Sequence, residues 1–240
     1  MKISTYGNGC TQCALQFRGQ QDFLEFSKRL VNGPPHWLGG SFESEGQYEI
    51  PILPPVDLSA VPVRSTPFDK AKASVVDRDC LVNFYVADSK FSRILSHPEK
   101  YVETFLGYGA ITSPDISMWS DSPIHFRVAA TWYNRRIGYY FNSQGIPVIP
   151  QVRWIDSRDY DHCFAGIAPN SLVAVSNNGC WHDRDLRQGF LLGFGELIER
   201  LNPSGIIVTG RLDRSMLLIA GSRTQLFHLP SRQTQELRVA

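Results

Sequence analysis

Apolar segments of about five residues alternate with longer amphipathic segments from Cys80 onward. The apolar segments, which predict strands, are residues 81–86, 110–112, 146–150, 172–176 and 205–209. Between them, residues 98–106, 122–141 and 183–201 repeat apolar positions every three or four residues, as helices packed on one face do. Strands that are apolar on both faces are typical of a parallel sheet covered by helices. The pattern therefore predicts an α/β fold of parallel βα repeats forming a small or incomplete (βα) barrel, with an open doubly wound sheet as the alternative.

The segment before Cys80 has a different pattern. Residues 20–31 have helical spacing, and the seven prolines between residues 33 and 79 argue against further helix and favour an extended arm with one short strand near residues 48–53. We therefore divide the chain into an N-terminal helix and Pro-rich arm, residues 1–79, and a βα-repeat domain, residues 80–240. Near the other end, residues 216–222 and 225–229 predict a C-terminal hairpin.

The amino-acid composition favours a globular protein and argues against a nonspecific nucleic-acid binder or a membrane protein. With 42% hydrophobic and 20% charged residues, the 240-residue chain is expected to fold into a globular unit. Its net charge of +1 lacks the basic excess of a nonspecific nucleic-acid binder. No apolar run approaches the roughly 20 residues of a membrane span, so we expect no membrane association. The five cysteines, an odd number, fit a reducing compartment, and we expect a cytoplasmic protein.

In both predicted architectures a ligand would bind at the carboxyl ends of the strands, and these positions are polar in this chain. The candidate catalytic residues are Asp115 and Asp88. The candidate substrate-binding residues are Arg153, Trp154, Asn177, Ser113 and Arg211.

Each candidate has a chemical reason and a structural alternative. Asp115 would act as an acid, base or nucleophile, and Arg153 would hold a phosphate or a developing anion with its planar fork. Trp154 would stack on a base and Asn177 would orient the substrate through its amide. Alternatively, Asp88 and Asp115 begin local turns, Trp154 belongs to the core, and Asn177 is part of a turn.

Motifs for metal binding, cofactor binding or other catalytic chemistry are few in this sequence. Cys10 and Cys13 form a single C-x-x-C with no second pair at matching spacing, so we predict no metal site. There is no dinucleotide-binding, P-loop, zinc-protease or nucleophile-elbow motif, and no cofactor is identified. Within the long helix, Arg135 and Arg136 are adjacent, and we expect one to face solvent while the other reaches a strand end or an acidic partner.

Several short motifs follow one another between residues 113 and 176. They are Ser113-Pro114-Asp115-Ile116-Ser117, Tyr133-Asn134-Arg135-Arg136, Gly145-Ile146-Pro147-Val148-Ile149-Pro150 with Trp154 beyond, and Val173-Ala174-Val175-Ser176. In order and spacing this string resembles an uncharacterised family of bacterial and phage proteins, a domain of unknown function. The resemblance implies a protein of phages or mobile elements, located in the host cytoplasm if it is phage-encoded, and carries no established activity. Members often have two adjacent acids where this chain has Ala87-Asp88.

Two functions remain open. The first is an enzyme that acts on a nucleotide, nucleoside or nucleic-acid substrate at the carboxyl end of the sheet. The alternative is a non-catalytic phage accessory protein that binds a host or phage macromolecule, since near-zero net charge and 12% aromatic residues also suit a protein–protein surface. An enzyme should bring Asp115 and Arg153 together at one concave pocket, whereas a binding module should scatter them. The oligomeric state is not indicated.

Overall fold

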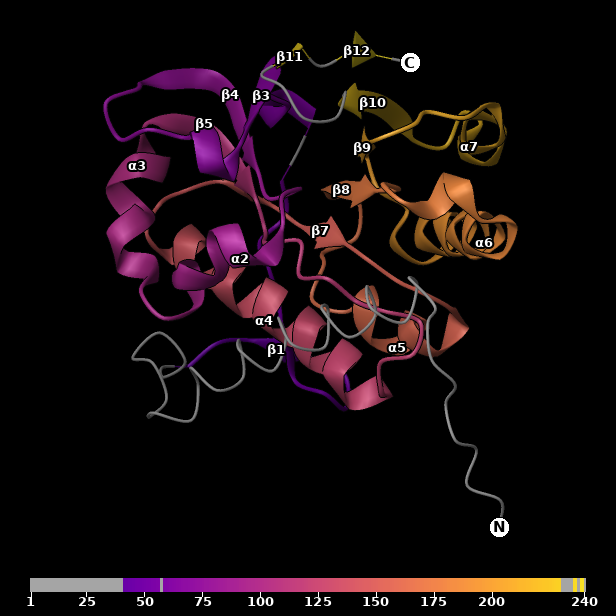
Figure 1. The fold of residues 1–240 in the computed structure, drawn as a ribbon. Helices are drawn as coiled ribbons and strands as arrows, with labels where there is room; N and C mark the ends of the chain where they lie inside the picture. Colours follow the sequence, from indigo (N-terminus) through magenta and orange to yellow (C-terminus); the bar gives the residue numbers. More distant parts are fainter. Residues whose placement is uncertain (1–40, 57, 230–234, 237, 240) are drawn as a thin grey trace, which may run out of the picture.

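The computed structural model describes residues 41–56, 58–229, 235–236 and 238–239. Two five-stranded sheets lie at the centre, and helices cover their outer faces (Figure 1). Within each sheet four strands are parallel and one short edge strand is antiparallel. The predicted α/β class with parallel βα repeats is therefore confirmed, although the described strands do not join into a closed barrel. The predicted helix over residues 20–31 lies outside the described residues.

The first sheet has the order β11-β3-β4-β5-β6. Its strands are β3 (Arg64–Pro67), β4 (Asp77–Asn83), β5 (Tyr108–Thr112), β6 (Val148–Ile149) and the antiparallel β11 (Gln235–Glu236). β3 lies in the segment that we expected to be an arm, and it pairs in parallel with β4. β4 begins earlier than predicted and ends at Asn83, before the aromatic residues that follow it.

The second sheet has the order β12-β10-β9-β8-β7. Its strands are β7 (Gln151–Val152), β8 (Leu172–Ser176), β9 (Gly205–Thr209), β10 (Gln225–Leu229) and the antiparallel β12 (Arg238–Val239). β8 and β9 have the predicted bounds, and every residue of β9 is buried. Gln151 pairs with Ala174 in parallel, as the βα-repeat prediction requires.

One stretch of chain connects the two sheets. β6 pairs with β5 of the first sheet, and β7, two residues later, pairs with β8 of the second. Pro150 lies between them and has no N–H to donate, but its carbonyl oxygen accepts a hydrogen bond from the amide of Ala174 at 2.9 Å. Residues 148–152 therefore contribute to both sheets, which face each other across a shared core.

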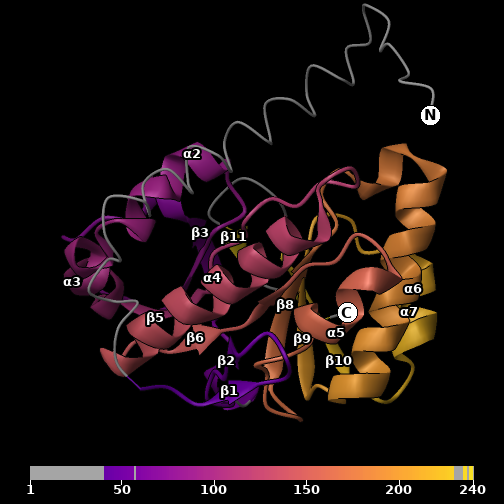
Figure 2. The same ribbon diagram turned by 90° about the horizontal axis from the view of Figure 1, so that it is seen from below.

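The helices lie on the outer faces of the sheets (Figures 1 and 2). They are α2 (Asp88–Phe91), α3 (Val102–Leu106), α4 (Ile124–Ser143), α5 (Tyr160–Cys163), α6 (Arg184–Leu201) and α7 (Arg214–Ala220). α2 and α3 lie beside the first sheet, and α6 and α7 beside the second (Figure 2). A small antiparallel pair, β1 (Ser44–Glu45) and β2 (Ile50–Pro51), packs against α4. No described helix is long and apolar enough to cross a bilayer.

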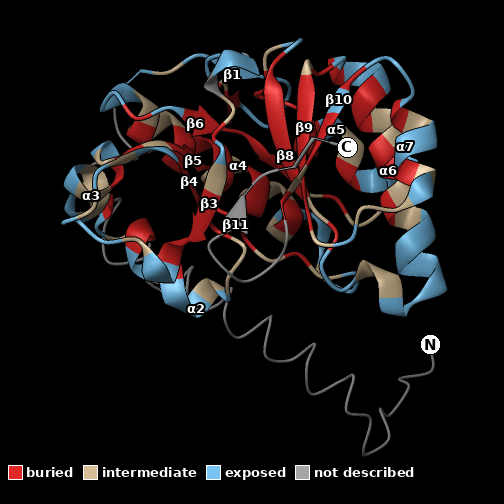
Figure 3. Ribbon diagram, turned by 90° about the horizontal axis from the view of Figure 1, so that it is seen from above, coloured by how far each residue is buried: buried red, intermediate tan, exposed pale blue. Residues whose placement is uncertain are grey.

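The core has three parts. One apolar cluster lies between the first sheet and its helices, and a second between the other sheet and α6. The third lies between the two sheets and takes side chains from both, including Leu81, Ile149, Leu172 and Ile207. The strands are accordingly buried on both faces (Figure 3), which is why their sequences are apolar without alternation.

A C-terminal antiparallel pair is present as predicted and includes residues 225–229, but residues 216–222 are not its other strand. Residues 214–220 form α7, with the Asp213 side chain accepting a hydrogen bond from the amide of Ser215 at 2.9 Å. α7 buries Met216 and Ala220, which are four residues apart, and this spacing of buried residues is that of a helix. β10 then pairs in parallel with β9, and the antiparallel pair at this end of the fold is β10 with β12.

The expectation that Arg135 or Arg136 would face solvent is also wrong, because both are buried. Arg135 does reach a strand end: its guanidinium donates to the carbonyl oxygens of Gln151 and Cys163, each at 2.8 Å. The Arg136 guanidinium lies over the Phe42 ring, 5.0 Å from its centroid. Both sides of α4 are covered because further chain segments pack on the face opposite the sheet.

Candidate functional site

A cavity of about 580 Å³ opens at the carboxyl ends of the parallel strands. Its wall includes residues that end or follow strands of both sheets, among them Asn83, Asp115, Arg153, Ser176 and Thr209. The volume lies within the range of about 300–1,000 Å³ that small-molecule sites occupy. The cavity is therefore at the edge where the parallel topology places a ligand.

Asp115 and Arg153 are joined across this wall. Nε of Arg153 donates to Oδ1 of Asp115 at 2.6 Å, and Nη2 donates to Oδ2 at 2.5 Å. Nε2 of Gln151 adds a third donor to the same carboxylate at 2.7 Å. Burial lowers the pKa of Arg153, but the Asp115 carboxylate outweighs this effect, and the net pKa is raised. The Arg153 guanidinium therefore keeps its positive charge, and Asp115, 6% exposed and held by three donors, positions it.

The second predicted carboxylate, Asp88, is half-buried and is not part of the cavity wall. It accepts two hydrogen bonds from Ser117, from the hydroxyl at 2.9 Å and from the backbone amide at 3.1 Å. Burial raises the pKa of Asp88 to about 6, against the lowering effect of these hydrogen bonds, and the negative charge of Asp115 raises it further. Ser117 lines the cavity, so the Asp88 carboxylate is linked to the cavity by its hydrogen bond to the Ser117 hydroxyl.

Two lysines contribute positive charge to the cavity wall. Lys90 forms an ion pair with Asp69, another wall residue. Lys70 forms no ion pair with any described residue. Together with Arg153, three cations and two carboxylates line the cavity, so the wall carries a small positive excess. Sequence reasoning missed both lysines, because their segments come to the cavity only through the tertiary packing of β3 and α2.

Two hydroxyl-bearing residues, Tyr85 and Thr209, also belong to the cavity. The sequence placed Thr209 at the carboxyl end of a predicted strand, where a ligand was expected, but Tyr85 was missed. Both line the cavity, one after β4 and the other at the end of β9, and both hydroxyl oxygens are buried without a hydrogen bond of normal geometry in the described structure. Burial raises the pKa of Tyr85, although Thr209 lies near enough to lower it in part. The predicted strand over residues 81–86 placed Tyr85 inside the sheet, whereas β4 ends two residues before it.

Trp154 does not lie in the cavity wall. It is 7% exposed, stacks on Phe190 at a centroid distance of 5.3 Å, and donates from its indole nitrogen to the carbonyl oxygen of Gly189 at 3.3 Å. The ring fills the core between β7 and α6. This position does not fit the expected stacking on a base.

Three other predicted residues shape the loops around the cavity. The amide of Asn177 holds the backbone of Arg211, accepting from its N–H at 2.8 Å and donating to its carbonyl oxygen. Gly210 between them has φ +107°, and a Cβ there would lie 2.2 Å from the Asn177 side chain. The guanidinium of Arg211 lies over the Trp181 ring, 5.3 Å from its centroid. Ser113 is buried and donates to the Asn134 side chain at 2.8 Å. None of the three side chains is part of the cavity wall.

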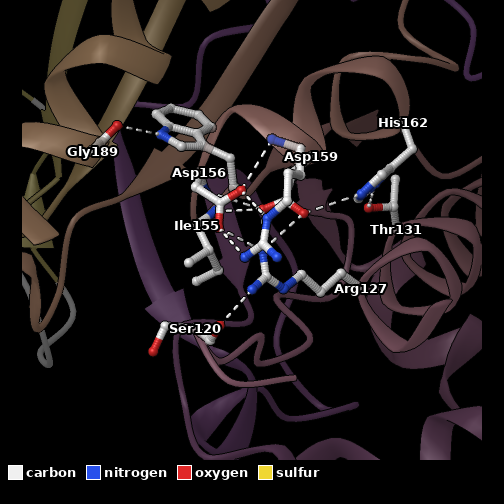
Figure 4. Close-up of polar contacts among 10 residues, drawn as sticks. Ser120, Arg127, Thr131, Ile155, Asp156, Asp159, His162 and Gly189 are labelled. Carbon is white, nitrogen blue, oxygen red and sulfur yellow. Dashed lines mark hydrogen bonds and ion pairs between the residues drawn. The ribbon is translucent and has the colours of Figure 1, made fainter. Parts of the chain in front are cut away.

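A second polar cluster lies beside α4 and is drawn in Figure 4. Nη1 of Arg127, whose side chain is 1% exposed, bonds to Asp156 at 3.0 Å and to Asp159 at 3.3 Å. His162 lies between Asp159, at 3.3 Å, and the Thr131 hydroxyl, at 3.0 Å. Although Thr131, His162 and Asp159 resemble a nucleophile–base–acid series, His162 and Asp159 are fully buried. The cluster therefore ties the loop after β7 to α4.

Within the described residues, no group of three or more His, Cys, Asp or Glu side chains is arranged to hold a metal ion. Cys10 and Cys13 lie outside those residues. Cys80, Cys163 and Cys180 are free thiols, and burial raises the pKa of each.

Comparison with known proteins identifies relatives from phages. The model of the Domain of unknown function (DUF4417) matches residues 42–218. The Gene 1 protein of Mycobacterium phage L5 is 30% identical over 172 residues, which cover 72% of this chain and 75% of that protein. The Gene 1 protein of Mycobacterium phage D29 is 31% identical over 175 residues, 72% of this chain and 64% of that protein. No solved structure matches the chain. The resemblance seen in the motifs is confirmed, and the chain belongs to the DUF4417 family.

Proposed function

We propose that the protein is an enzyme that binds a phosphorylated small molecule of the nucleotide class in the cavity at the carboxyl ends of the strands. The observation that carries this proposal is the meeting, at one cavity, of a buried Asp115–Arg153 pair with Ser117 and its partner Asp88. A non-catalytic binding module would not require this convergence of polar groups from both sheets.

The charges of the wall favour an anionic ligand. Lys70 extends from the segment after β3 and has no competing carboxylate in the described residues, so its ammonium group is available to a phosphate. Arg153 keeps its charge at any physiological pH, and its Nη1 is not used in the bonds to Asp115. A phosphate between these two side chains would offset the small positive excess of the wall.

The uncharged groups of the wall favour a ligand that also carries a base. The side-chain amide of Asn178 lies in the wall and makes no hydrogen bond to a described residue. An amide presents one acceptor and two donors, which matches the edge of a nucleobase. The buried hydroxyls of Tyr85 and Thr209 give the inner part of the cavity further hydrogen-bonding capacity.

A thermal-shift panel tests the proposal. The panel contains inorganic phosphate, the four ribonucleoside monophosphates, ATP and the corresponding unphosphorylated nucleosides. We expect at least one nucleotide to raise Tm in a concentration-dependent way, since a ligand at 100 times its Kd adds about 2.7 kcal/mol to stability. The unphosphorylated nucleosides should have much smaller effects.

Two lysine variants locate the binding. Lys70→Ala should weaken the Kd of that nucleotide at least about tenfold, the effect of losing one charge-assisted hydrogen bond. Lys100→Ala, which removes an equally exposed lysine outside the cavity wall, is the matched control and should leave the Kd unchanged. If no panel member shifts Tm at millimolar concentration, the proposal is wrong.

A further inference from the structure

We infer that Ser117 is the nucleophile of this cavity, with Asp88 as its general base, and that it accepts the phosphoryl group of the bound ligand. The inference rests on the proposed function and deepens it. It assigns the chemical step to Ser117 and Asp88, whereas the sequence alone pointed to Asp115 and Asp88 as catalytic residues.

The positions of the two residues relative to the cavity support this assignment. Both are half-buried, but Ser117 lines the cavity and Asp88 is not part of its wall. The hydroxyl of Ser117 donates to Oδ1 of Asp88 at 2.9 Å, which is the separation expected of a nucleophile and its base. A ligand in the cavity would therefore meet the serine oxygen first and the carboxylate only through it.

The carboxylate is also held in place for this role. The backbone amide of Ser117 donates to Oδ2 of Asp88 at 3.1 Å, so both carboxylate oxygens are directed at the same residue. The base is thus oriented by the backbone that carries the nucleophile. Asp115, in contrast, is committed to Arg153 and Gln151 through three hydrogen bonds.

The charges around Ser117 suit an incoming phosphoryl group. Lys90 and Arg153 share the cavity wall with Ser117 and can stabilise negative charge on the phosphoryl oxygens. Burial holds the pKa of Asp88 near 6, so it is ionised at neutral pH, and it is a stronger base than an ordinary carboxylate. Both conditions are needed for a serine to lose its proton as it attacks.

The step balances as follows. The Ser117 oxygen forms a bond to phosphorus as the bond from phosphorus to the ester oxygen of the ligand breaks. The proton of the Ser117 hydroxyl passes to Asp88, and the departing oxygen takes a proton from solvent water and leaves as an alcohol. Water then attacks the phosphoserine and loses a proton to solvent, Asp88 returns its proton to the Ser117 oxygen, and inorganic phosphate is released.

The test uses the full chain with two probes, p-nitrophenyl phosphate and the nucleotide that gives the largest Tm shift. Phosphate release is measured directly, and acid-quenched samples are digested for mass spectrometry. We expect one added phosphoryl group on the peptide that contains residue 117. Ser117→Ala should abolish both the adduct and the phosphate release while the nucleotide still raises Tm. Asp88→Asn should slow release about a hundredfold, the usual contribution of a general base.

Ser120→Ala is the matched control on the same segment. Its side chain is exposed, and the contact that the residue makes to Arg127 uses its backbone carbonyl. It should release phosphate like the wild type. If nucleotides bind but the wild type forms no phosphoserine, or if Ser117→Ala releases phosphate at the wild-type rate, the Ser117 assignment is wrong and the proposed binding function survives. If no nucleotide binds, the proposed function fails first.

Discussion

The guanidinium of Arg153 holds the carboxylate of Asp115 side-on, through Nε and Nη2, across the wall of the cavity. The two partners differ in exposure: the Asp115 side chain is 6% exposed and the Arg153 side chain 26%. If one partner is removed, water can therefore hydrate the remaining charge of Arg153 more easily than that of Asp115.

This asymmetry predicts unequal effects of the two single substitutions. Arg153→Ala leaves a buried carboxylate without its cation and should lower the free energy of unfolding by about 3 kcal/mol. Asp115→Asn keeps the volume and leaves a partly hydrated cation, so we expect a loss of about 1 kcal/mol. Urea unfolding at pH 7 measures both. Equal losses would contradict the asymmetry, and Glu199→Gln, in an exposed ion pair with Arg223, is the control.

The raised pKa of Asp88 predicts a pH dependence of stability. Because the folded pKa of about 6 lies above the usual value, the folded state binds a proton more tightly than the unfolded state, and this stabilisation is lost as pH rises through 6. Asp88→Asn cannot ionise. The variant should match the wild type near pH 4 and exceed its stability at pH 8 by up to about 3 kcal/mol. Parallel pH profiles for the two proteins would show that Asp88 has an ordinary pKa in the folded state.

Arg127 should be essential for stability. Arg127→Met leaves the fully buried Asp159 without its cation and should cost about 3–5 kcal/mol. Adding Asp159→Asn removes the uncompensated charge and should recover part of the loss. Arg158→Ala removes a 64% exposed arginine that also contacts this cluster, and it should cost at most about 1 kcal/mol. Thermal unfolding of the wild type and the three variants measures whether their losses of stability follow this order.

Two glycines of α6 predict opposite effects of the same substitution. A Cβ at Gly193 would lie 2.1 Å from Nε1 of Trp154, so Gly193→Ala should displace the indole and cost about 1–3 kcal/mol. At Gly195 the nearest neighbour lies at 3.8 Å, an ordinary contact. Gly195→Ala should stabilise the helix by about 0.5–1 kcal/mol. Denaturation midpoints of the two variants give the comparison, and two changes of the same sign would refute it.

Tyr85→Phe should leave the stability of the free protein within about 0.5 kcal/mol of the wild type, because the hydroxyl that it removes has no well-formed hydrogen bond. Tyr108→Phe is the matched control. The Tyr108 hydroxyl accepts a hydrogen bond from the amide of Lys72 at 2.9 Å, and its loss should cost about 1 kcal/mol. A larger loss for Tyr85→Phe than for Tyr108→Phe would show that the Tyr85 hydroxyl is satisfied in solution.

The sequence predicted those elements whose local pattern and final environment agree. β8 and β9 are apolar along their whole length because both faces are buried, and Asp183 caps α6 through the amides of Asp185 and Leu186. β3 was missed because Arg64-Ser65-Thr66-Pro67 contains no strongly apolar residue, although three of its four residues are buried. α7 was taken for a strand because Leu217, Leu218 and Ile219 are consecutive and apolar.

The contact between Asp115 and Arg153 could be expected from the sequence, because both residues follow strands. Their strands, β5 and β7, belong to different sheets, and the residues meet because β6, the neighbour of β5, leads directly into β7. The contact between Asp88 and Ser117 depends on how α2 packs, and the position of Lys70 depends on a strand that was not recognised. Trp154 follows Arg153 immediately, but successive side chains point to opposite faces of an extended segment, and Trp154 enters the core behind the wall.

The bridging segment around Pro150 bears on how the chain folds. Because β6 and β7 are two residues apart and belong to different sheets, the two sheets are tethered closely at Pro150, and the pairing of each strand limits how far the other can move. The outer edges are joined in a similar way, since β11 covers β3 and β12 covers β10 from one short stretch of chain. The first sheet therefore completes its edge only after residue 235 is available, and unfolding should follow a single cooperative transition although the strands form two sheets.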